Sequence, residues 1–179
     1  VFHDRIAFEN VWFRYREDDS APWVLKDFSL SIRRNERVAL VGPTGGGKST
    51  ILKLLNRTYD ISKGAITIDG VDLRDLDLPS LRRLFAVVLQ DVHLFSGPLR
   101  NNLALREGTS QRTIESAIDM VRATDIVARL PQGYDTPMQE LGSNLSSGER
   151  QLISFARALV VDPQILVLDE ATSHIDSDT

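Results

Sequence analysis

Short apolar runs separated by polar turns dominate the first half of the chain, and they predict β-strands. Residues 5–15 alternate in part between apolar and polar positions and are rich in aromatic and β-branched side chains, which favours one or two strands. Residues 28–32 alternate strictly, and residues 65–72 have the pattern of a strand, an Asp-Gly turn and a short return strand. The runs Val38–Val41 and Ala86–Leu89 are apolar throughout, so we expect two buried strands there.

The second half of the chain begins with a different pattern. Between residues 94 and 137, helix-like runs follow one another with little strand signal. Ser110 is a candidate N-cap for a helix that reaches Ala123, because Ser side chains accept hydrogen bonds from the free amides at a helix start. The apolar side chains of this helix form one stripe, made of Ile114, Ala117, Ile118 and Val121. We therefore expect a helical insert in a fold that also contains strands.

Further helices and one last strand complete the pattern. Residues 51–55 and 79–85 each predict a short helix, and residues 145–161 predict a long one that the pair Asp162-Pro163 ends. Residues 165–168 are wholly apolar, as is typical of a strand in the middle of a parallel sheet. Strands interleaved with helices place the chain in the α/β class.

Composition narrows the class of protein. With 179 residues, of which 42% are hydrophobic and 26% charged, the chain suits one globular domain with a sizeable core. The absence of cysteine excludes disulfides and thiolate metal sites. A net charge of −4 argues against a nucleic-acid partner, which usually needs a basic face. No apolar run approaches the length of a membrane span and the N-terminus has no signal-peptide pattern, so we expect this chain itself to be soluble.

One glycine-rich segment carries the strongest chemical signal. It lies between an apolar run and a helix pattern and fits G-x-x-x-x-G-K-[ST], the phosphate-binding loop of nucleotide-binding proteins. Its residues are Gly42, Pro43, Thr44, Gly45, Gly46, Gly47, Lys48, Ser49 and Thr50. Glycines let the backbone curl so that successive N–H groups face a phosphate. Lys48 would contact the β- and γ-phosphates, and the Ser49 hydroxyl would ligate Mg²⁺. The alternative, a chance glycine-rich turn, is disfavoured by the two flanking patterns.

An acidic pair directly follows the last apolar strand. In folds with a phosphate loop, such a strand lies beside the strand that leads into the loop, so its carboxyl end faces the phosphates. Asp169 would then hold Mg²⁺, and Glu170 would polarise a water molecule for attack on the γ-phosphate. The alternative is that the pair opens a solvated loop. Beside a complete phosphate loop we favour the catalytic interpretation, which predicts hydrolysis of ATP with Mg²⁺.

The segment before the long helix resembles the signature motif of ABC-transporter ATPases. It consists of Leu145, Ser146, Ser147, Gly148 and Glu149, followed by Arg150 and Gln151. Other positions match the family's motifs in the same order along nearly the whole chain. Tyr15 resembles the aromatic residue that stacks on adenine, and Gln90 resembles the Q-loop glutamine, which senses the γ-phosphate or Mg²⁺ during catalysis. Ser173 and Asp176 belong to a segment similar to the D-loop.

Two segments resemble the exporters of this family in particular. Residues 94–102 look like the exporter-type segment that follows the Q-loop. Glu140 falls in the short segment with which exporters of the family touch transmembrane loops. An importer ATPase stays an alternative, and residues 95–102 favour the exporter. DNA-repair and chromosome ATPases share the signature but carry long coiled-coil insertions, and no sustained heptads occur here.

The resemblance implies a fold and a mechanism. The fold would be a P-loop NTPase core with a mixed or parallel sheet, an N-terminal antiparallel β-subdomain and a helical signature subdomain. We expect residues 1–90 and 160–179 to form the β-subdomain and nucleotide core of a single domain, and residues 91–160 the helical insert. In the family, two such domains pack head to tail with ATP between the phosphate loop of one and the signature of the other. Hydrolysis would power export, with the transmembrane domains as partners at the cytoplasmic face of the membrane.

Two residues depart from the family's usual Leu-Ser-Gly-Gly-Gln signature. Ser147 adds a side chain where the partner's phosphate should approach, and Glu149 puts a negative charge in place of an amide. Both would weaken the ATP site that this signature completes. Because Glu170 is present, the chain resembles one member of a heterodimeric exporter, in which one of two ATP sites is degenerate.

The family's switch histidine belongs on a strand beyond the D-loop. The histidines of this sequence are His3, His93 and His174, and none of them follows such a strand. We therefore expect a domain without its last strands that binds ATP and hydrolyses it poorly by itself. A nucleotide-dependent dimerisation module without turnover is the alternative function.

Overall fold

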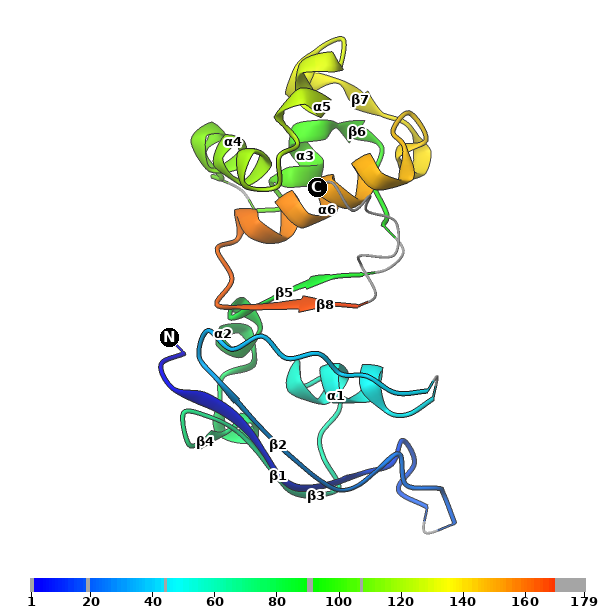
Figure 1. Ribbon diagram of the computed structural model, residues 1–179, viewed down its shortest axis with the longest axis vertical. Coiled ribbons are helices and arrows are strands. Elements are labelled where there is room, and N and C mark those ends of the chain that lie inside the picture. Colours follow the sequence, from blue (N-terminus) through cyan, green and yellow to red (C-terminus); the bar gives the residue numbers. More distant parts are fainter. Residues whose placement is uncertain (1, 19, 44, 90–91, 107, 170–179) are drawn as a thin grey trace. The chain divides into compact units, whose positions relative to one another are not determined.

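The computed structural model describes residues 2–18, 20–43, 45–89, 92–106 and 108–169. The chain divides into two units, residues 1–85 and residues 86–179, and each unit has its own core. Their helices and strands are labelled in Figure 1.

The first unit is built on an antiparallel sheet of four strands in the order β2-β1-β3-β4. The strands are β1 (Arg5–Phe13), β2 (Leu25–Arg33), β3 (Lys63–Ile68) and β4 (Val71–Asp72). Figure 1 shows β1, β2 and β3 running side by side. Aromatic and β-branched residues of β1 supply much of the core, namely the buried Ile6, Phe8, Val11 and Phe13. The predicted N-terminal antiparallel strands are confirmed.

Two helices and one 3₁₀ turn complete the first unit. They are α1 (Lys48–Leu55), η1 (Leu73–Asp75) and α2 (Leu78–Arg83). The Asp77 carboxylate caps α2 by accepting a hydrogen bond from the backbone N–H of Ser80 at 3.0 Å. The helix expected over residues 79–85 therefore begins one residue earlier and ends at Arg83, because Phe85 already belongs to the following strand.

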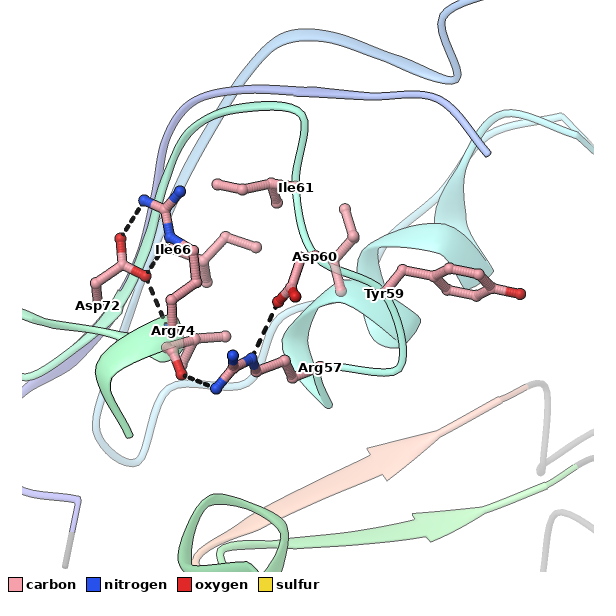
Figure 2. A pocket seen from close by; sticks show the side chains of 9 residues that line it. Arg57, Tyr59, Asp60, Ile61, Ile66, Asp72 and Arg74 are labelled. Atoms are coloured by element: carbon pink, nitrogen blue, oxygen red, sulfur yellow. Dashed lines mark hydrogen bonds and ion pairs between the residues drawn. The ribbon is translucent and has the colours of Figure 1, made fainter. Parts of the chain in front are cut away.

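Charged residues tie the end of α1 to the turn after β4, as Figure 2 shows. Arg57 Nε donates to Asp60 Oδ1 at 3.0 Å, and its Nη1 donates to the carbonyl oxygen of Leu73, also at 3.0 Å. Arg74 pairs with Asp72 at 2.6 Å, and this hydrogen-bonded partner holds the pKa of the Asp72 carboxyl below its ordinary value. The helix that follows the glycine-rich loop is thus anchored to the sheet.

The expected buried strand before the glycine-rich loop is absent. Residues 36–43 form no strand, and Val41 is 90% exposed. A strand requires a neighbour that supplies hydrogen bonds, and the four strands of the first unit pair with one another. The prediction of a buried strand at Val38–Val41 is therefore wrong for the described structure. An apolar run indicates a tendency to be buried, but it does not specify which strand would pair with it.

Two strands of the second unit pair with each other. They are β5 (Phe85–Val88) and β8 (Ile165–Leu168), and the backbone N–H of Asp169 donates to the carbonyl oxygen of Val88 at 3.0 Å. Both strands were predicted. However, β8 does not lie in the middle of a sheet among the described strands: Leu166 is 42% and Leu168 46% exposed, because β5 borders only one edge of it.

Helices make up most of the second unit. They are α3 (Leu99–Leu103), α4 (Gln111–Met120), α5 (Thr124–Arg129) and α6 (Ser147–Val160), with 3₁₀ turns η2 (Gly133–Asp135) and η3 (Glu140–Gly142). A two-residue ladder joins β6 (Gly97–Pro98) to β7 (Pro137–Met138). The predicted helical insert is confirmed, although the helix expected to reach Ala123 ends at Met120, because Arg122 adopts a left-handed φ of 56°.

The core of the second unit forms between α6 and the other helices. The predicted stripe on α4 is confirmed: Ile114, Ala117 and Ile118 are buried in one cluster with Ile153 and Ala156 of α6. Figure 1 shows α3, α4 and α5 gathered on one side of α6. Toward the strands, Ala158 of α6 packs with the buried Ala86 and Val88 of β5. The long predicted helix therefore organises this unit.

Candidate nucleotide site

The glycine-rich loop curls and leads directly into α1. Gly45 and Gly47 have left-handed φ values of 80° and 85°, and the N–H of Gly46 donates to the carbonyl oxygen of Pro43 at 3.0 Å. At Gly47 a Cβ atom would lie 3.0 Å from Leu25 Cδ2, so this position favours glycine for space as well as for backbone conformation. The loop residues thus have the curvature that the motif predicts, with Thr44 outside the described residues.

Lys48 lies inside this curl. Its Nζ donates to the carbonyl oxygens of Gly42 at 2.7 Å and Pro43 at 2.9 Å. Gly47, at the N-cap of α1, provides no side-chain hydrogen bond, so the helix start presents backbone N–H groups and a positive dipole end. The exposed Ser49 follows in the first turn of the helix. An ammonium group and free backbone N–H groups at a helix start are the groups that bind anions in proteins, and the Ser49 hydroxyl in the same turn is a ligand type that Mg²⁺ accepts.

The structure brings Tyr15 to the same helix. Its hydroxyl lies 2.9 Å from Thr50 Oγ1, and its ring packs edge-on against Phe13 and Tyr59 at 5.0 and 5.2 Å between centroids. Tyr15 as a whole is nevertheless 46% exposed, and Lys53 Nζ lies over its ring, 5.6 Å from the centroid, so contact with a planar ligand stays a prediction. Sequence reasoning predicted the aromatic residue but not its hydrogen bond to Thr50, because the two are 35 positions apart.

The signature segment forms the start of α6. Ser146 is the N-cap, and its hydroxyl accepts a hydrogen bond from the N–H of Glu149 at 3.2 Å. Glu149 Oε2 in turn accepts from the N–H of Ser146 at 2.8 Å, which completes a capping box. The side chain of Leu145 is buried, and Arg150 donates to its carbonyl oxygen at 2.6 Å. The exposed Ser147 and the half-buried Gly148 occupy the first turn.

Glu149 has a second partner that the sequence did not reveal. Arg129, the last residue of α5, lies 2.6 Å from Glu149 Oε1. Hydrogen bonds from Ser146, followed by the pairing with Arg129, hold the pKa of Glu149 below its ordinary value. Twenty positions separate the two residues, and no spacing rule links a residue of one helix to the first turn of another.

A buried polar network connects α6 with the segment after Gln90. Arg157 donates to the carbonyl oxygens of Asn102 at 2.7 Å and His93 at 3.0 Å, and burial lowers its pKa. Asn102, which is 1% exposed, hydrogen-bonds both backbone groups of Phe95. The ring of Phe95 itself is 62% exposed. The network therefore fixes the backbone of the predicted exporter-type segment while leaving its aromatic ring at the surface.

Several predicted site residues fall outside the described part of the chain. They are Gln90, Glu170, Ser173 and Asp176, together with His174. Asp169 follows β8, and its backbone N–H donates to the carbonyl oxygen of Val88 in β5 at 3.0 Å. The prediction that this strand lies beside the strand leading into the phosphate loop is wrong for the described residues, because residues 36–43 form no strand and β8 pairs with β5. The phosphate loop belongs to the first unit and Asp169 to the second, so a joint site for Mg²⁺ stays a prediction.

The residues predicted to hold Mg²⁺ have the side-chain chemistry for that ion. Within the described ranges, no three acidic or histidine side chains gather to hold a metal by themselves. Ser49, Asp169 and Gln90, the residues predicted to hold Mg²⁺, each carry a side-chain oxygen, which is the ligand atom that Mg²⁺ prefers. None of the helices in the described part of the chain combines the length and apolar character needed to cross a bilayer.

Comparisons with known proteins agree with this geometry. A family model described as "ABC transporter" matches residues 25–173. The probable multidrug resistance ABC transporter ATP-binding/permease protein YheH of Bacillus subtilis is 48% identical over 176 residues, which are 98% of this chain and 26% of that protein. An ATP-dependent lipid A-core flippase of Syntrophus aciditrophicus is 47% identical over 176 residues, 98% of this chain and 29% of the flippase.

A solved structure gives the same result for the fold. A bacterial Atm1-family ABC exporter with ATP bound has 42% sequence identity and a TM-score of 0.90, over 98% of this chain and 30% of the exporter chain. This chain therefore spans less than a third of the length of the relatives it matches. The predicted α/β fold, with a P-loop NTPase core, an antiparallel N-terminal sheet and a helical signature region, is confirmed. The chain belongs to the ABC transporter family and has the fold of that family's ATP-binding domain.

Proposed function

We propose that this chain is the ATP-hydrolysing domain of an ABC exporter. The observation that carries the proposal is the phosphate loop, in which Lys48 lies within a curled glycine backbone at the start of a helix with no side-chain cap. The relatives support export as the process that hydrolysis powers, since they are named as a multidrug resistance transporter, a lipid A-core flippase and an Atm1-family exporter.

Each residue of the site would have one task. The first N–H groups of α1 would donate to phosphate oxygens, and Lys48 would turn from its two carbonyl acceptors to the β- and γ-phosphates. Ser49, Asp169 and Gln90 would hold Mg²⁺, whose charge offsets that of the β- and γ-phosphates. Glu170 would accept a proton from the attacking water. Tyr15, which is 46% exposed, would stack on the adenine ring.

A second ATPase domain would complete the site. The first turn of α6 presents the N–H groups of Ser147 and Gly148 at a positive dipole end, which suits the γ-phosphate of an ATP held by the partner. The D-loop residues Ser173 and Asp176 would meet the same partner. ATP would then hold the two domains together, and its hydrolysis would release them.

Transmembrane domains are the other expected partners, at the cytoplasmic face of the membrane. A pocket of about 230 Å³ lies in the second unit between β5, α6 and the segment after Gln90. Its lining includes Leu89 and Leu105, which are 55% and 56% exposed, and Phe95 is exposed nearby in the chain. Exposed apolar side chains around a hollow are typical of a docking surface. Glu140 belongs to the same expected contact.

We also propose that the partner ATPase domain is a different chain. Ser147 supports this, because its exposed side chain stands in the turn that a partner's phosphate would approach, where the family usually has glycine. A Cβ and a hydroxyl at that place limit how closely a phosphate can reach the amides. This signature would therefore complete a weak ATP site, and a second chain would supply the stronger one.

The function is tested by Glu170→Gln in the full-length protein assembled with its partner domain. Loss of the general base should reduce steady-state phosphate release about 10²- to 10⁴-fold. ATP binding should remain, so an ATP-bound dimer should accumulate in gel filtration. Glu115→Gln, an exposed change on α4, is the matched control. Equal phosphate release by Glu170→Gln and the unmodified protein would instead favour a dimerisation module without turnover.

A further inference from the structure

The acidic residue of the signature is held by two groups at once. Glu149 Oε2 accepts the N–H of Ser146 at 2.8 Å, and Glu149 Oε1 pairs with Arg129 at 2.6 Å. The carboxylate thus folds back over the N-cap of α6 and has no oxygen without a partner. The side chain of Glu149 is only 24% exposed, whereas that of Arg129 is 68% exposed.

The position of this carboxylate matters for an anion that approaches the helix. A negative side chain in the first turn stabilises the helix through the dipole, but it repels a phosphate that approaches the same amides. A neighbouring cation reduces that repulsion, because its attraction for the phosphate opposes the repulsion from the carboxylate. The nearby Arg150 keeps its charge but directs its hydrogen bonds to the carbonyl oxygens of Leu145 and Gly142. Arg129 is the residue whose cation meets Glu149.

We propose that Arg129 is a positioning residue for the signature: it holds Glu149 in the capping box and cancels its charge, so that the first amides of α6 stay attractive to a partner's γ-phosphate. This inference rests on the proposed function. It changes how Glu149, one of the two departures from the family's signature, is interpreted. Glu149 is then a compensated replacement for the usual amide, and Ser147 is the departure that weakens the site.

The ion pair also restrains the conformation of the Glu149 side chain. Arg129 Nε donates to the carbonyl oxygen of Asp125 at 3.3 Å, so its guanidinium bridges the last turn of α5 and the first turn of α6. Loss of the bridge would free the Glu149 side chain to take up other rotamers, which include ones that extend toward the approaching phosphate. Both effects of losing Arg129 depend on the carboxylate of Glu149.

A double-mutant cycle in the full-length exporter tests the proposal through the KM for ATP in phosphate release. Arg129→Ala should raise this KM about three- to fivefold with little change in kcat, because an uncompensated surface charge has a modest effect. Added to Glu149→Gln, the same change should alter KM less than about twofold, since no carboxylate remains to compensate. The Arg129→Ala defect should also shrink between about 0.05 and 0.5 M salt, because salt screens the repulsion.

Arg112→Ala, an exposed change on α4, is the matched control and should leave KM unchanged. A defect of Arg129→Ala that persists in the Glu149→Gln background, or that salt does not reduce, would overturn the inference in favour of a packing role. So would a KM for Arg129→Ala equal to that of the control. A parent protein that neither binds nor hydrolyses ATP would overturn the proposed function, and this inference with it.

Discussion

At the scale of single residues, Lys48 is half-buried, whereas the other lysines of the described residues are exposed. Its Nζ is held by the carbonyl oxygens of Gly42 and Pro43, so the ammonium is already placed where phosphates would lie. Lys26 on β2 carries the same charge on an exposed strand, away from the loop in the sequence. Comparing substitutions of these two lysines therefore separates the effect of the side chain's position on ATP binding from the effect of its charge.

Replacing Lys48 by alanine should remove most of the affinity for ATP. A charge-assisted hydrogen bond contributes about 1.5–3 kcal/mol, which corresponds to roughly a 10- to 150-fold rise in Kd. Titration with a fluorescent ATP analogue measures this, and Lys26→Ala should bind as the unmodified protein does. Unchanged affinity in Lys48→Ala would mean that the phosphate-loop assignment is wrong.

At the scale of an element, the junction of β1 and β3 depends on one glycine. Gly64 has a φ of +90°, and a Cβ there would collide with the carbonyl oxygens of Glu9 and Asn10 on the neighbouring strand. This close approach falls at an irregularity in the β1–β3 register. Gly70, in the turn between β3 and β4, has a similar φ of +81°, and a Cβ added there would meet no described atom within 4 Å.

These two glycines make a matched pair of substitutions. Gly70→Ala should cost about 1–2 kcal/mol of unfolding free energy, the strain of a left-handed alanine. Gly64→Ala carries the same strain plus a clash with backbone, so it should cost more than about 4 kcal/mol. Urea denaturation followed by tryptophan fluorescence reports on the first unit, which contains Trp12 and Trp23. Equal losses of unfolding free energy in the two variants would show that the backbone of β1 shifts to accommodate the added Cβ.

At the scale of the whole molecule, the proposed activity requires a second ATPase domain. The full-length protein alone should form few ATP-bound dimers, whereas a 1:1 complex with a distinct partner chain should bind two ATP and hydrolyse one of them faster. Native mass spectrometry counts the chains and nucleotides. Ser147→Gly should increase turnover at the slower site, because it lets a phosphate approach the first amides of α6. Symmetric, equally active homodimers of this protein would contradict the heterodimer.

Local signals in the sequence predicted the parts that depend on neighbours along the chain. The strands β1 to β3, the apolar stripe of α4 and the long helix α6 all followed from short-range patterns. The prediction was wrong for Val38–Val41, because an apolar run does not specify a hydrogen-bonding partner. The pairing of Arg129 with Glu149 was missed for a related reason: it joins two helices, and only their packing brings the charges together.

The sequence by itself determined the family's chemistry. The order of glycines, Lys48 and Ser49 predicts a phosphate-binding loop, because this motif depends on residue type at fixed spacing. The resemblance of residues 145–149 to the family's signature predicts a second anion-binding helix start. The tertiary structure decided what surrounds them. It placed Tyr15 against Thr50, buried Asn102 beneath Phe95 and set Arg129 on Glu149, because contacts between distant residues arise only when packed elements share a core.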